Sequence, residues 1–411
     1  MKLKIYNDDY TINEYNISKE LFFDKSINNK VSYIASSSKE QNALKILKSY
    51  FSNAKSILFD NTNRAILEKL ENLNIKEFYK KEYKENIFDK QNFSFLYFTS
   101  GSTGFPIAAL KTKENIFSEI NDLTHLLKEY HIKRVIVTVP FMHIYGSLFG
   151  LFYPLKNDID IILKEHFLPN DLLDLINENS LIVTTPLYIK ALNQLNSKKN
   201  LKDSIFISST EPLLSIDAKE FKDKFNTNII QIFGSTETGG IAYKYNDEEL
   251  WNALNSVKLS TDNENKLKVT SPYVSNIIYE EEFKQTNKSV QTFDFVELFN
   301  NKFKLIGRSS QILKIAGKRY STIQIENILE KVEGITRALV LVNSRNSLRG
   351  DILYITIESN KEFFVKDIQK ILKKELSNLK FSINLNIVNK IKTSSTGKKL
   401  AIQYNPTLKE I

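Results

Sequence analysis

Apolar strand-like runs alternate with helical patterns through the middle of the chain, and this alternation limits the folds open to it. The runs are continuously apolar, which is typical of strands buried on both faces of a sheet. Strands separated by helices are joined by crossovers, so the pattern predicts a mostly parallel sheet flanked by helices. The predicted strands are 134–139, 159–163, 181–185, 204–208 and 228–233, and the predicted helices between them are 171–177, 187–195 and 217–225.

The chain before this region contains further predicted elements. Ile116, Ile120, Leu123 and Leu127 recur at helical spacing, which indicates an amphipathic helix over 113–130. Shorter patterns predict the strands 2–6, 31–34, 56–59 and 93–98, the helices 36–51 and 64–73, and a loop over 82–90.

The pattern changes in the last third of the chain. Short alternating strands without a helix, from Leu267 to Leu305, predict a small β-rich subdomain. After Gly307-Arg308 comes a separate mixed unit with its own core, with predicted strands 311–315, 338–342, 353–358 and 383–388 and helices 322–332 and 366–376. We predict an α/β protein with two domains: a large N-terminal domain, 1–309, that includes the β-rich subdomain, and a small mobile α+β domain, 310–411.

Composition excludes several classes of site. The chain has 411 residues, 42% of them apolar, and no cysteine, which rules out disulfides, cysteine-ligated zinc and a cysteine nucleophile. No pair among the four histidines has metal-site spacing. The formal charge of +9 is spread along helical stretches, which is typical of a solvated surface; it is compatible with an acidic partner, and nothing specific indicates nucleic acid.

The first residues of the chain and its apolar runs do not indicate a membrane protein. Residues Met1–Asp9 lack the apolar core of a signal peptide. The longest apolar run, Ile144–Leu155, contains glycine and serine and is too short to span a bilayer. We therefore predict a cytoplasmic protein without a membrane span.

A stretch of hydroxyl and glycine residues follows the predicted strand 93–98. Glycine lets backbone N–H groups turn toward a ligand and Ser/Thr hydroxyls add donors, so such a turn can cradle phosphates. A surface turn is the plainer alternative. A Walker P-loop is excluded, because Phe105 and Pro106 follow the last glycine where that motif has Lys and Ser/Thr. The stretch comprises Thr99, Ser100, Gly101, Ser102, Thr103 and Gly104.

A second glycine-framed cluster, Phe233–Gly240, comes directly after the predicted strand 228–233. Its carboxylate, Glu237, stands at the ligand end of the predicted sheet, and hard oxygen ligands suit Mg²⁺ shared with phosphates. Phe233 offers a ring face to a base. The alternative is a loop with an exposed glutamate.

Two further positions combine charge with glycine or hydroxyl neighbours. Asp294 and Arg308 stand 14 residues apart on predicted short strands, where they suit ribose hydroxyls or a phosphate, or form an unrelated surface pair. Lys398 follows Gly397 in a Ser/Thr-rich loop, where a cation can meet a developing negative charge, or it is an exposed lysine in a lysine-rich tail.

The order and spacing of these clusters over residues 93–411 resemble one family. It is the adenylate-forming superfamily, which includes acyl-CoA synthetases, the adenylation domains of peptide synthetases and firefly luciferase. Thr99–Gly104 is similar to its phosphate loop and Gly234–Glu237 to its Thr-Glu motif. Asp294 looks like its ribose aspartate, Gly307-Arg308 like the start of its hinge, and Gly397-Lys398 like its C-terminal Gly-Lys.

The resemblance assigns roles to individual residues. The loop Thr99–Gly104 would hold the β- and γ-phosphates of ATP, Thr236 would contact the α-phosphate, and Glu237 would ligate Mg²⁺. Lys398 would stabilise the carboxylate oxygen and the α-phosphate during adenylation. The remaining positions would be the adenine pocket (Phe233, Gly234, Thr210, Glu211 and Pro212), the ribose contacts (Asp294 and Arg308) and the gate beside the acyl carboxylate (His143). The alternative for His143 is a packed core histidine.

The sequence departs from the family pattern at several points. Ile107 replaces the lysine that usually follows the loop's proline, and either that lysine is dispensable or Lys111 replaces it. Ser310 stands at the usual hinge Asp or Lys, and the segment before the phosphate loop is short. Part of the standard substrate channel is then missing.

The resemblance implies an acid-thiol ligase that forms AMP. A fatty or aromatic acid would be activated with ATP and Mg²⁺ to an acyl-adenylate, then passed to a pantetheine thiol. The short N-terminal part favours an acyl carrier protein as acceptor, with free CoA as the alternative. A non-catalytic nucleotide- or acyl-binding protein is the alternative of another class.

Overall fold

The computed structural model describes residues 1–78, 83–98, 107–197, 199–308, 312–315, 318–343, 352–375, 382–393 and 399. The chain divides into two compact units. The N-terminal unit comprises Met1–Lys258 and Val269–Val290, and the C-terminal unit comprises Leu259–Lys268 and Gln291–Ile411. The predicted division between residues 309 and 310 stays a prediction.

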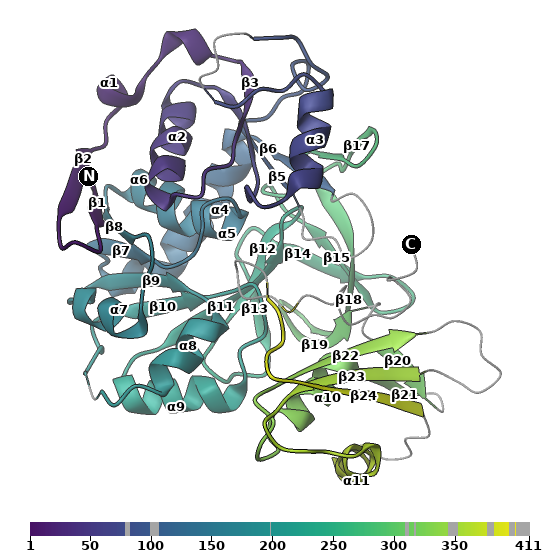
Figure 1. Cartoon of the computed structure of the whole chain (residues 1–411). Helices are drawn as coiled ribbons and strands as arrows, with labels where there is room; N and C mark the ends of the chain where they lie inside the picture. The colour runs from purple at the N-terminus through teal and green to yellow at the C-terminus, as the bar shows by residue number, and fades with distance from the viewer. Residues whose placement is uncertain are drawn as a thin grey trace. The chain divides into compact units, whose positions relative to one another are not determined.

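The larger sheet of the N-terminal unit confirms the predicted buried, mostly parallel arrangement (Figure 1). Its strand order is β13-β12-β11-β10-β9-β7-β8-β1-β2. All pairs from β11 to β1 are parallel, while the pairs at both ends are antiparallel. The bounds are β1 Lys2–Tyr6, β2 Ile12–Asn16, β7 Arg134–Val137, β8 Asp160–Lys164, β9 Ser180–Thr184, β10 Ile205–Ser208, β11 Ile229–Ser235, β12 Gly239–Tyr245 and β13 Trp251–Ala253.

A second, mixed sheet of the N-terminal unit contains the strand that leads to the hydroxyl- and glycine-rich stretch. Its order is β17-β16-β6-β5-β4-β3, parallel from β3 to β5 and antiparallel beyond. Sequence patterns predicted the parallel half and also short strands over 267–305, which include β16 and β17, but not β6 or the place of β16 and β17 in this sheet. The bounds are β3 Val31–Ile34, β4 Lys55–Leu58, β5 Phe95–Phe98, β6 Ala108–Lys111, β16 Ile277–Tyr279 and β17 Phe283–Gln285.

Helices cover the sheets, and side-chain caps fix where the longer ones begin. Ser38 accepts a hydrogen bond from Gln41 N at 3.2 Å, and Thr112 forms a capping box with Asn115. In Figure 1, α8 and α9 lie below β9–β11 and α7 lies to the left of these strands; the apolar faces of the three helices share one core with β9–β11. The bounds are α1 Lys19–Phe22, α2 Lys39–Phe51, α3 Arg64–Asn72, α4 Lys113–Leu127, α5 Ile144–Ser147, α6 Tyr153–Asn157, α7 Pro169–Leu175, α8 Pro186–Asn193 and α9 Ser215–Phe225.

The apolar run 144–155 is a buried helical segment. It begins as α5, continues as a π-helical turn over Leu148–Phe152, and ends in α6. A Cβ on Gly146 would stand 2.1 Å from the carbonyl oxygen of Pro140, so glycine permits this close approach. Within the described residues, we find no helix with both the length and the apolar character needed to cross a membrane.

The C-terminal unit contains the predicted α+β part and the portion of the predicted alternating strands that lies outside residues 269–290. Strands β14, β15, β18 and β19 follow one another in the sheet order, and β20 pairs with β21. In the three-stranded sheet, α10 packs on β22 and α11 on β24 around a common core that includes Ile325, Leu353 and Ile368. The bounds are β14 Lys258–Thr261, β15 Lys266–Thr270, β18 Ser289–Phe299, β19 Lys302–Arg308, β20 Ile312–Ile315, β21 Lys318–Ser321, α10 Thr322–Leu329, β22 Arg337–Asn343, β23 Ile352–Glu358, α11 Val365–Glu375 and β24 Ser382–Val388.

Candidate active site

One buried tyrosine contacts the carboxyl ends of two parallel strands, β9 and β10. The hydroxyl of Tyr145 lies 2.9 Å from the carbonyl oxygen of Thr184 and 2.8 Å from that of Ile207. It therefore attaches the start of α5 to the last residues of β9 and β10. Ligands of open α/β sheets bind at this edge, and His143, Thr210 and Glu237 come after its strands β7, β10 and β11.

His143 stands at the N-cap position of α5, two residues before Tyr145. It is half-buried, and its carbonyl oxygen accepts a hydrogen bond from Ser147 N at 3.1 Å. The Ser147 hydroxyl lies 2.7 Å from the hydroxyl of Tyr97 on β5. The strand that leads to the predicted phosphate loop therefore ends beside the helix that His143 begins. The loop itself, Thr99–Gly104, lies outside the described residues.

The glycine-framed cluster is a tight hairpin between β11 and β12, where sequence patterns predicted only a turn after a strand. Gly234 pairs with Gly240 and Ser235 with Gly239, which leaves a three-residue turn, 236–238. A Cβ on Gly234 would stand 2.3 Å from Gly239 O, and Gly239 has a φ of +70°. Glycine is therefore required at both positions.

Two hydroxyl groups, those of Ser235 and Thr238, fix the backbone of this turn by hydrogen bonds. The Thr238 hydroxyl accepts a hydrogen bond from Ser235 N at 3.1 Å, and it lies 2.8 Å from the carbonyl oxygen of Gly239, to which it donates. Ser235 Oγ in turn accepts from Thr238 N at 3.2 Å. With its backbone fixed, the turn presents Thr236 and Glu237, both half-buried, at a defined place.

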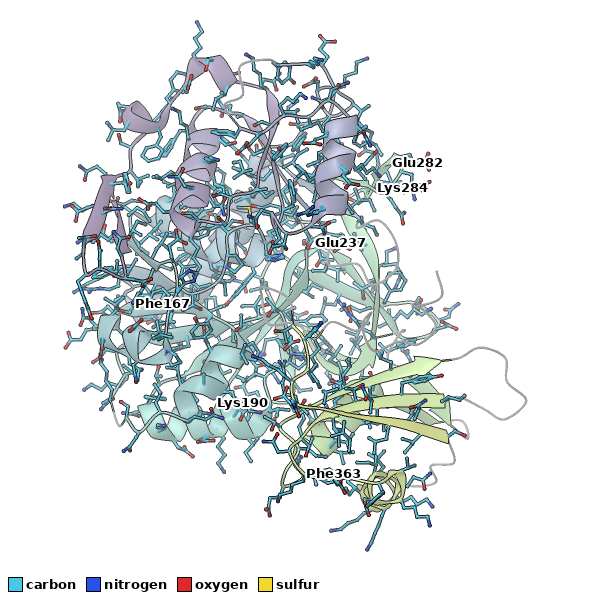
Figure 2. The ribbon with its side chains drawn as sticks, viewed as in Figure 1. Phe167, Lys190, Glu237, Glu282, Lys284 and Phe363 are labelled. Atoms are coloured by element: carbon cyan, nitrogen blue, oxygen red, sulfur yellow. The ribbon has the colours of Figure 1, made fainter. Side chains whose placement is uncertain are left out.

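Glu237, labelled in Figure 2, is held through its backbone carbonyl. Its carbonyl oxygen accepts hydrogen bonds from Ser275 N at 2.8 Å and from the Lys111 ammonium at 3.2 Å. Its carboxylate makes no hydrogen bond or ion pair with any residue that the structure describes. The carboxylate oxygens are hard donors on a rigid support, which suits Mg²⁺.

Phe233 precedes the turn and packs against an aromatic neighbour. Its ring centroid lies 5.4 Å from that of Trp251 on β13, with the two planes inclined by 49°. Lys244 Nζ lies 5.0 Å from the centroid of the same indole ring. The half-buried phenyl ring is thus supported by a rigid aromatic partner, as a surface for stacking a base would need.

Thr210 has a strained backbone just beyond the end of β10. Its φ is +84°, a region that a β-branched residue rarely occupies, and such a conformation costs about 1–3 kcal/mol. Glu211 beside it is half-buried and Pro212 is exposed. Because β10 and β11 are parallel neighbours, Thr210 and Phe233 follow adjacent strands at the same edge of the sheet.

Asp294 and Arg308 form a cross-strand pair within the C-terminal unit. They face each other in the β18–β19 register, and Arg308 Nε donates to Asp294 Oδ1 at 2.8 Å. The Asp294 side chain is 5% exposed and that of Arg308 is 45% exposed. The two charges that are 14 residues apart in sequence are therefore one ion pair, with the carboxylate buried and the guanidinium facing outward. Lys398 lies outside the described residues.

The N-terminal unit matches a known family along most of its length. The sequence profile of the AMP-binding enzyme family matches residues 27–273, more than half of the chain. The chain belongs to the AMP-binding enzyme family. The matched part contains His143, Thr210, Phe233 and Glu237, while Asp294, Arg308 and Lys398 lie beyond it.

Relatives of this AMP-binding enzyme include ligases for two kinds of acid. A putative long chain fatty acid-CoA ligase of Staphylococcus haemolyticus is 26% identical over 316 residues, which cover 73% of this chain and 67% of the relative. A 4-coumarate–CoA ligase of Cereibacter sphaeroides is 22% identical over 253 residues, 61% of this chain and 57% of that one.

A solved structure shares the fold over nearly the whole chain. The O-succinylbenzoate coenzyme A synthetase of Bacillus subtilis, in complex with ATP and a magnesium ion, superposes with a TM-score of 0.79 at 16% sequence identity. The similarity covers 97% of this chain and 96% of that one. It extends the family fold beyond the part that the sequence profile matches.

Sequence patterns did not identify the buried side chains that support the Glu237 turn of this AMP-binding enzyme. The sequence left Lys111 open as a replacement for the family's lysine at position 107, but its side chain is only 1% exposed. Its ammonium donates to the carbonyl oxygens of Tyr273, at 2.6 Å, and Glu237, at 3.2 Å. Lys111 thus holds the backbone of the turn and is not open to phosphate.

A buried carboxylate on α4 completes this support. Glu119 Oε1 accepts a hydrogen bond from Gly240 N at 2.7 Å, and a Cβ on Gly239 would lie 2.6 Å from Glu119 Oε2. One turn along α4, Asp122 accepts from the Tyr273 hydroxyl at 3.0 Å and from Ser256 N at 2.7 Å. Buried polar side chains of α4 therefore support the turn beside the apolar Leu254 and Ile232.

Burial makes the charges of Lys111 and Glu119 costly. Loss of hydration lowers the pKa of Lys111 to about 8, although the charges of Glu119 and Glu237 oppose the change. Loss of hydration likewise raises the pKa of Glu119, although Lys111 and the Gly240 N–H oppose it. A helical pattern placed Glu119 on α4, but no local sequence signal shows that it faces Gly240, 121 residues away.

Proposed function

We propose that the chain is an acid-thiol ligase that activates a carboxylic acid through an acyl-adenylate. A carboxylate oxygen attacks the α-phosphorus of ATP; the new O–P bond forms as the bond to the β-phosphate oxygen breaks, and pyrophosphate leaves. A pantetheine thiol, having lost its proton, then attacks the acyl carbonyl carbon. The thioester forms and AMP leaves.

The observation that carries this proposal is the Glu237 turn. It combines a rigid three-residue backbone turn, a carboxylate without a partner in the described part of the chain, and a location at the carboxyl edge of a parallel sheet. This combination occurs within the part of the chain that the family profile matches. A nucleotide with its bound cation is the ligand that such a turn suits best.

Glu237 would hold Mg²⁺ together with phosphate oxygens of ATP. When bound, Mg²⁺ supplies positive charge that neutralises the polyphosphate and the departing pyrophosphate. The fit rests on the donor type, because carboxylate and phosphate oxygens are the ligands that Mg²⁺ prefers. Thr236, next to it on the same turn, would donate its hydroxyl to the α-phosphate.

The other nucleotide contacts follow the family resemblance. Phe233, held against Trp251, would stack on adenine, and the Thr210–Pro212 segment would line the same pocket. Asp294 would accept hydrogen bonds from the ribose hydroxyls, oriented by its ion pair with Arg308. The loop Thr99–Gly104 would bind the β- and γ-phosphates, and Lys398 would stabilise the charge that develops at the α-phosphate.

The acid and the acceptor complete the proposal. A fatty or an aromatic acid is supported by relatives that are named as ligases for each, and His143 would stand at the gate beside its carboxylate. We propose an acyl carrier protein as the acceptor because of the basic surface, with CoA as the alternative. A cytoplasmic location stays a prediction.

Pyrophosphate release with a panel of fatty and aromatic acids tests the function. We expect release with ATP and Mg²⁺ for at least one acid, and a thioester on adding CoA or a holo carrier protein. Absence of release and of pyrophosphate–ATP exchange with every acid would leave a nucleotide- or acyl-binding protein instead.

Two glutamate variants make this test specific to the turn. Glu237→Gln should lower the adenylation rate on the order of 100-fold, the usual scale for losing one electrostatic contact in a transition state. Glu282→Gln changes an exposed glutamate of the β16–β17 hairpin and should leave the rate unchanged (Figure 2). Equal rates in the two variants would place the cation elsewhere.

A further inference from the structure

A lysine in the first turn of α2 contacts the carboxyl ends of two neighbouring parallel strands. Lys39 Nζ donates to the carbonyl oxygen of Thr138, directly after β7, at 3.0 Å. It also donates to the carbonyl oxygen of Lys164, the last residue of β8, at 3.3 Å. The paired register of β7 and β8 ends at Val137 and Leu163. The ammonium therefore joins the two chains one residue beyond the last pair of the sheet.

The backbone of Lys39 is attached to the same edge of the sheet by a carboxylate. Glu165, which follows β8, accepts hydrogen bonds through Oε1 from Ser38 Oγ at 2.5 Å and from Glu40 N at 3.1 Å. Its Oε2 accepts from Lys39 N at 2.8 Å. A carboxylate is favourable at a helix N-terminus, so this contact stabilises the start of α2 beside β8. The Lys39 side chain thus extends from a fixed backbone.

Thr138, the acceptor of Lys39, begins the loop that leads from β7 to α5 and ends at His143. On its other side Thr138 is bonded to β9, because its N–H donates to the carbonyl oxygen of Val183 at 3.0 Å. Its hydroxyl oxygen lies 3.1 Å from the same carbonyl oxygen and 3.1 Å from Thr184 Oγ1. Contacts from β9 and from Lys39 therefore hold the first residue of the loop.

The far end of this loop is held in a similar way. The Tyr145 hydroxyl contacts the strand-end carbonyls of β9 and β10. The close approach of Gly146 to the carbonyl oxygen of Pro140 and the complete burial of Phe141 hold the middle of the loop. His143 is thus the half-buried residue of a short loop with two anchored ends. A shift of one anchor has to move the residues between them.

We propose that Lys39 is a positioning residue for His143, and this inference rests on the proposed function. By holding the Thr138 carbonyl to the end of β8, Lys39 sets how far the loop stands out from the sheet. It thereby sets where the His143 side chain meets the carboxylate of the acid. The Glu237 turn follows β11, three strand spacings or about 14 Å from β7, so the nucleotide contacts there do not depend on this anchor.

Pyrophosphate–ATP exchange separates an effect on the acid from an effect on the whole fold. For Lys39→Met we expect the kcat/KM for the acid to fall on the order of 10- to 100-fold, because small misplacements of a contact group have effects of this size. The KM for ATP, measured at saturating acid, should stay at the wild-type value. Lys39→Arg keeps a cationic donor and should recover part of the kcat/KM for the acid.

A matched variant at the same junction controls for loss of stability. Ser38→Ala removes the N-cap hydroxyl of α2 and its contact with Glu165, but it leaves the Lys39 ammonium in place. We expect a lower melting temperature and an unchanged kcat/KM for the acid. Where Lys39→Met does not fold, Lys39→Gln keeps a shorter, neutral donor and is measured in the same way.

Histidine resonances report the position of His143 without any substrate. The chain has four histidines, so ¹³C-labelled histidine gives four imidazole signals, and His143→Gln identifies the one from His143. Lys39→Met should shift or broaden this signal, and Lys39→Arg should restore it. His125 on α4 and His131, which lies before β7, serve as internal references.

These measurements decide between the outcomes. A selective fall in kcat/KM for the acid together with a displaced His143 signal, both partly restored by Lys39→Arg, supports the positioning role. An unchanged His143 signal in the folded variant, or equal effects on the acid and on ATP, overturns it. If the wild-type chain shows no exchange with any acid, the proposed function has failed, and the histidine signals still decide whether Lys39 positions His143.

Discussion

Two lysines, one in each unit, differ in how their charge is balanced: Lys111 is fully buried, and the side chain of Lys399 is 16% exposed. Lys111 donates to two backbone carbonyls, and its nearest carboxylate neighbours act only across space. Lys399 contacts two carboxylates directly, those of Glu326 and Glu330. Burial opposes the charge on both, and it lowers the pKa of Lys111 to about 8, whereas the two carboxylates offset it at Lys399 and raise that pKa above its usual value.

The difference shows what each lysine contributes to its unit. Neutral carbonyls fix the direction of an ammonium without balancing its charge, so Lys111 costs stability while it holds the Glu237 turn. Direct carboxylate contacts balance the charge and bind the partners into one cluster. Lys111 therefore supports the Glu237 turn, and Lys399 stabilises the ion cluster of the C-terminal unit. The following variants test this distinction.

The largest effect is expected at Lys399. Its removal in Lys399→Met leaves two buried carboxylates side by side without a cation, and breaking a buried ion cluster in this way costs about 3–5 kcal/mol. We expect this loss in the free energy of unfolding, measured by urea titration with far-ultraviolet circular dichroism. The double variant with Glu330→Gln should recover part of it, and a loss no larger than that of Lys370→Met, which removes an exposed lysine of α11, would contradict the comparison.

A smaller effect is expected at Lys111. Lys111→Met leaves the carbonyls of Glu237 and Tyr273 without their donor, which costs about 1–3 kcal/mol for a buried polar group. Part of this loss in the free energy of unfolding is regained, because the substitution also removes a buried charge. The adenylation rate should fall more than that of Lys399→Arg, which keeps a cation in the C-terminal unit, since the turn loses its support. Unchanged adenylation kinetics would show that Ser275 alone holds the turn.

The two lysines should also respond differently to alkaline pH. The pKa of Lys111 in the folded chain is below that of the unfolded chain, so between about pH 8 and 10.5 the unfolded state binds more protons and stability rises with pH. The stability of the wild type relative to Lys111→Met should therefore increase across this window. Relative to Lys399→Met it should stay constant, because a raised pKa keeps Lys399 charged until higher pH. Parallel urea titrations at about pH 7.5, 9 and 10 measure both differences, and two identical pH profiles would remove the distinction.

The smallest expected effect concerns Thr210. Thr210→Gly relieves the strained φ of +84° and should raise stability by about 1 kcal/mol, after the entropy cost of glycine is subtracted. Thr210→Ala keeps the strain and should not stabilise. Thermal unfolding of the two variants distinguishes them, and equal melting temperatures would show that the strain is not costly.

Sequence patterns predicted the parts of the site that depend on local order. The strand before Phe233, the glycines around Glu237 and the acidic and basic residues of the β-rich part were all identifiable, because turns and buried strands have local signatures. The structure adds the register that pairs Asp294 with Arg308 and the hairpin that sets Glu237.

The supporting lysines were not identifiable in the same way. Lys111 is the last residue of an apolar strand and Lys399 lies in a lysine-rich tail, both ordinary settings for a solvated side chain. Their acceptors are 61 to 162 residues away in the sequence, so only the tertiary fold shows that they are buried. The contacts of Lys398 and of Thr99–Gly104 stay predictions.

The ring pair of Phe233 and Trp251 also gives the molecule a built-in optical probe. Trp251 is the single tryptophan of the chain, and it is nearly buried, with Phe233 and the Lys244 ammonium beside its indole. All indole emission of the native chain therefore originates next to the ring that would stack on adenine. Titrating ATP against the unlabelled protein and following the emission spectrum would then give the nucleotide affinity directly, with Phe233→Ala as the blank.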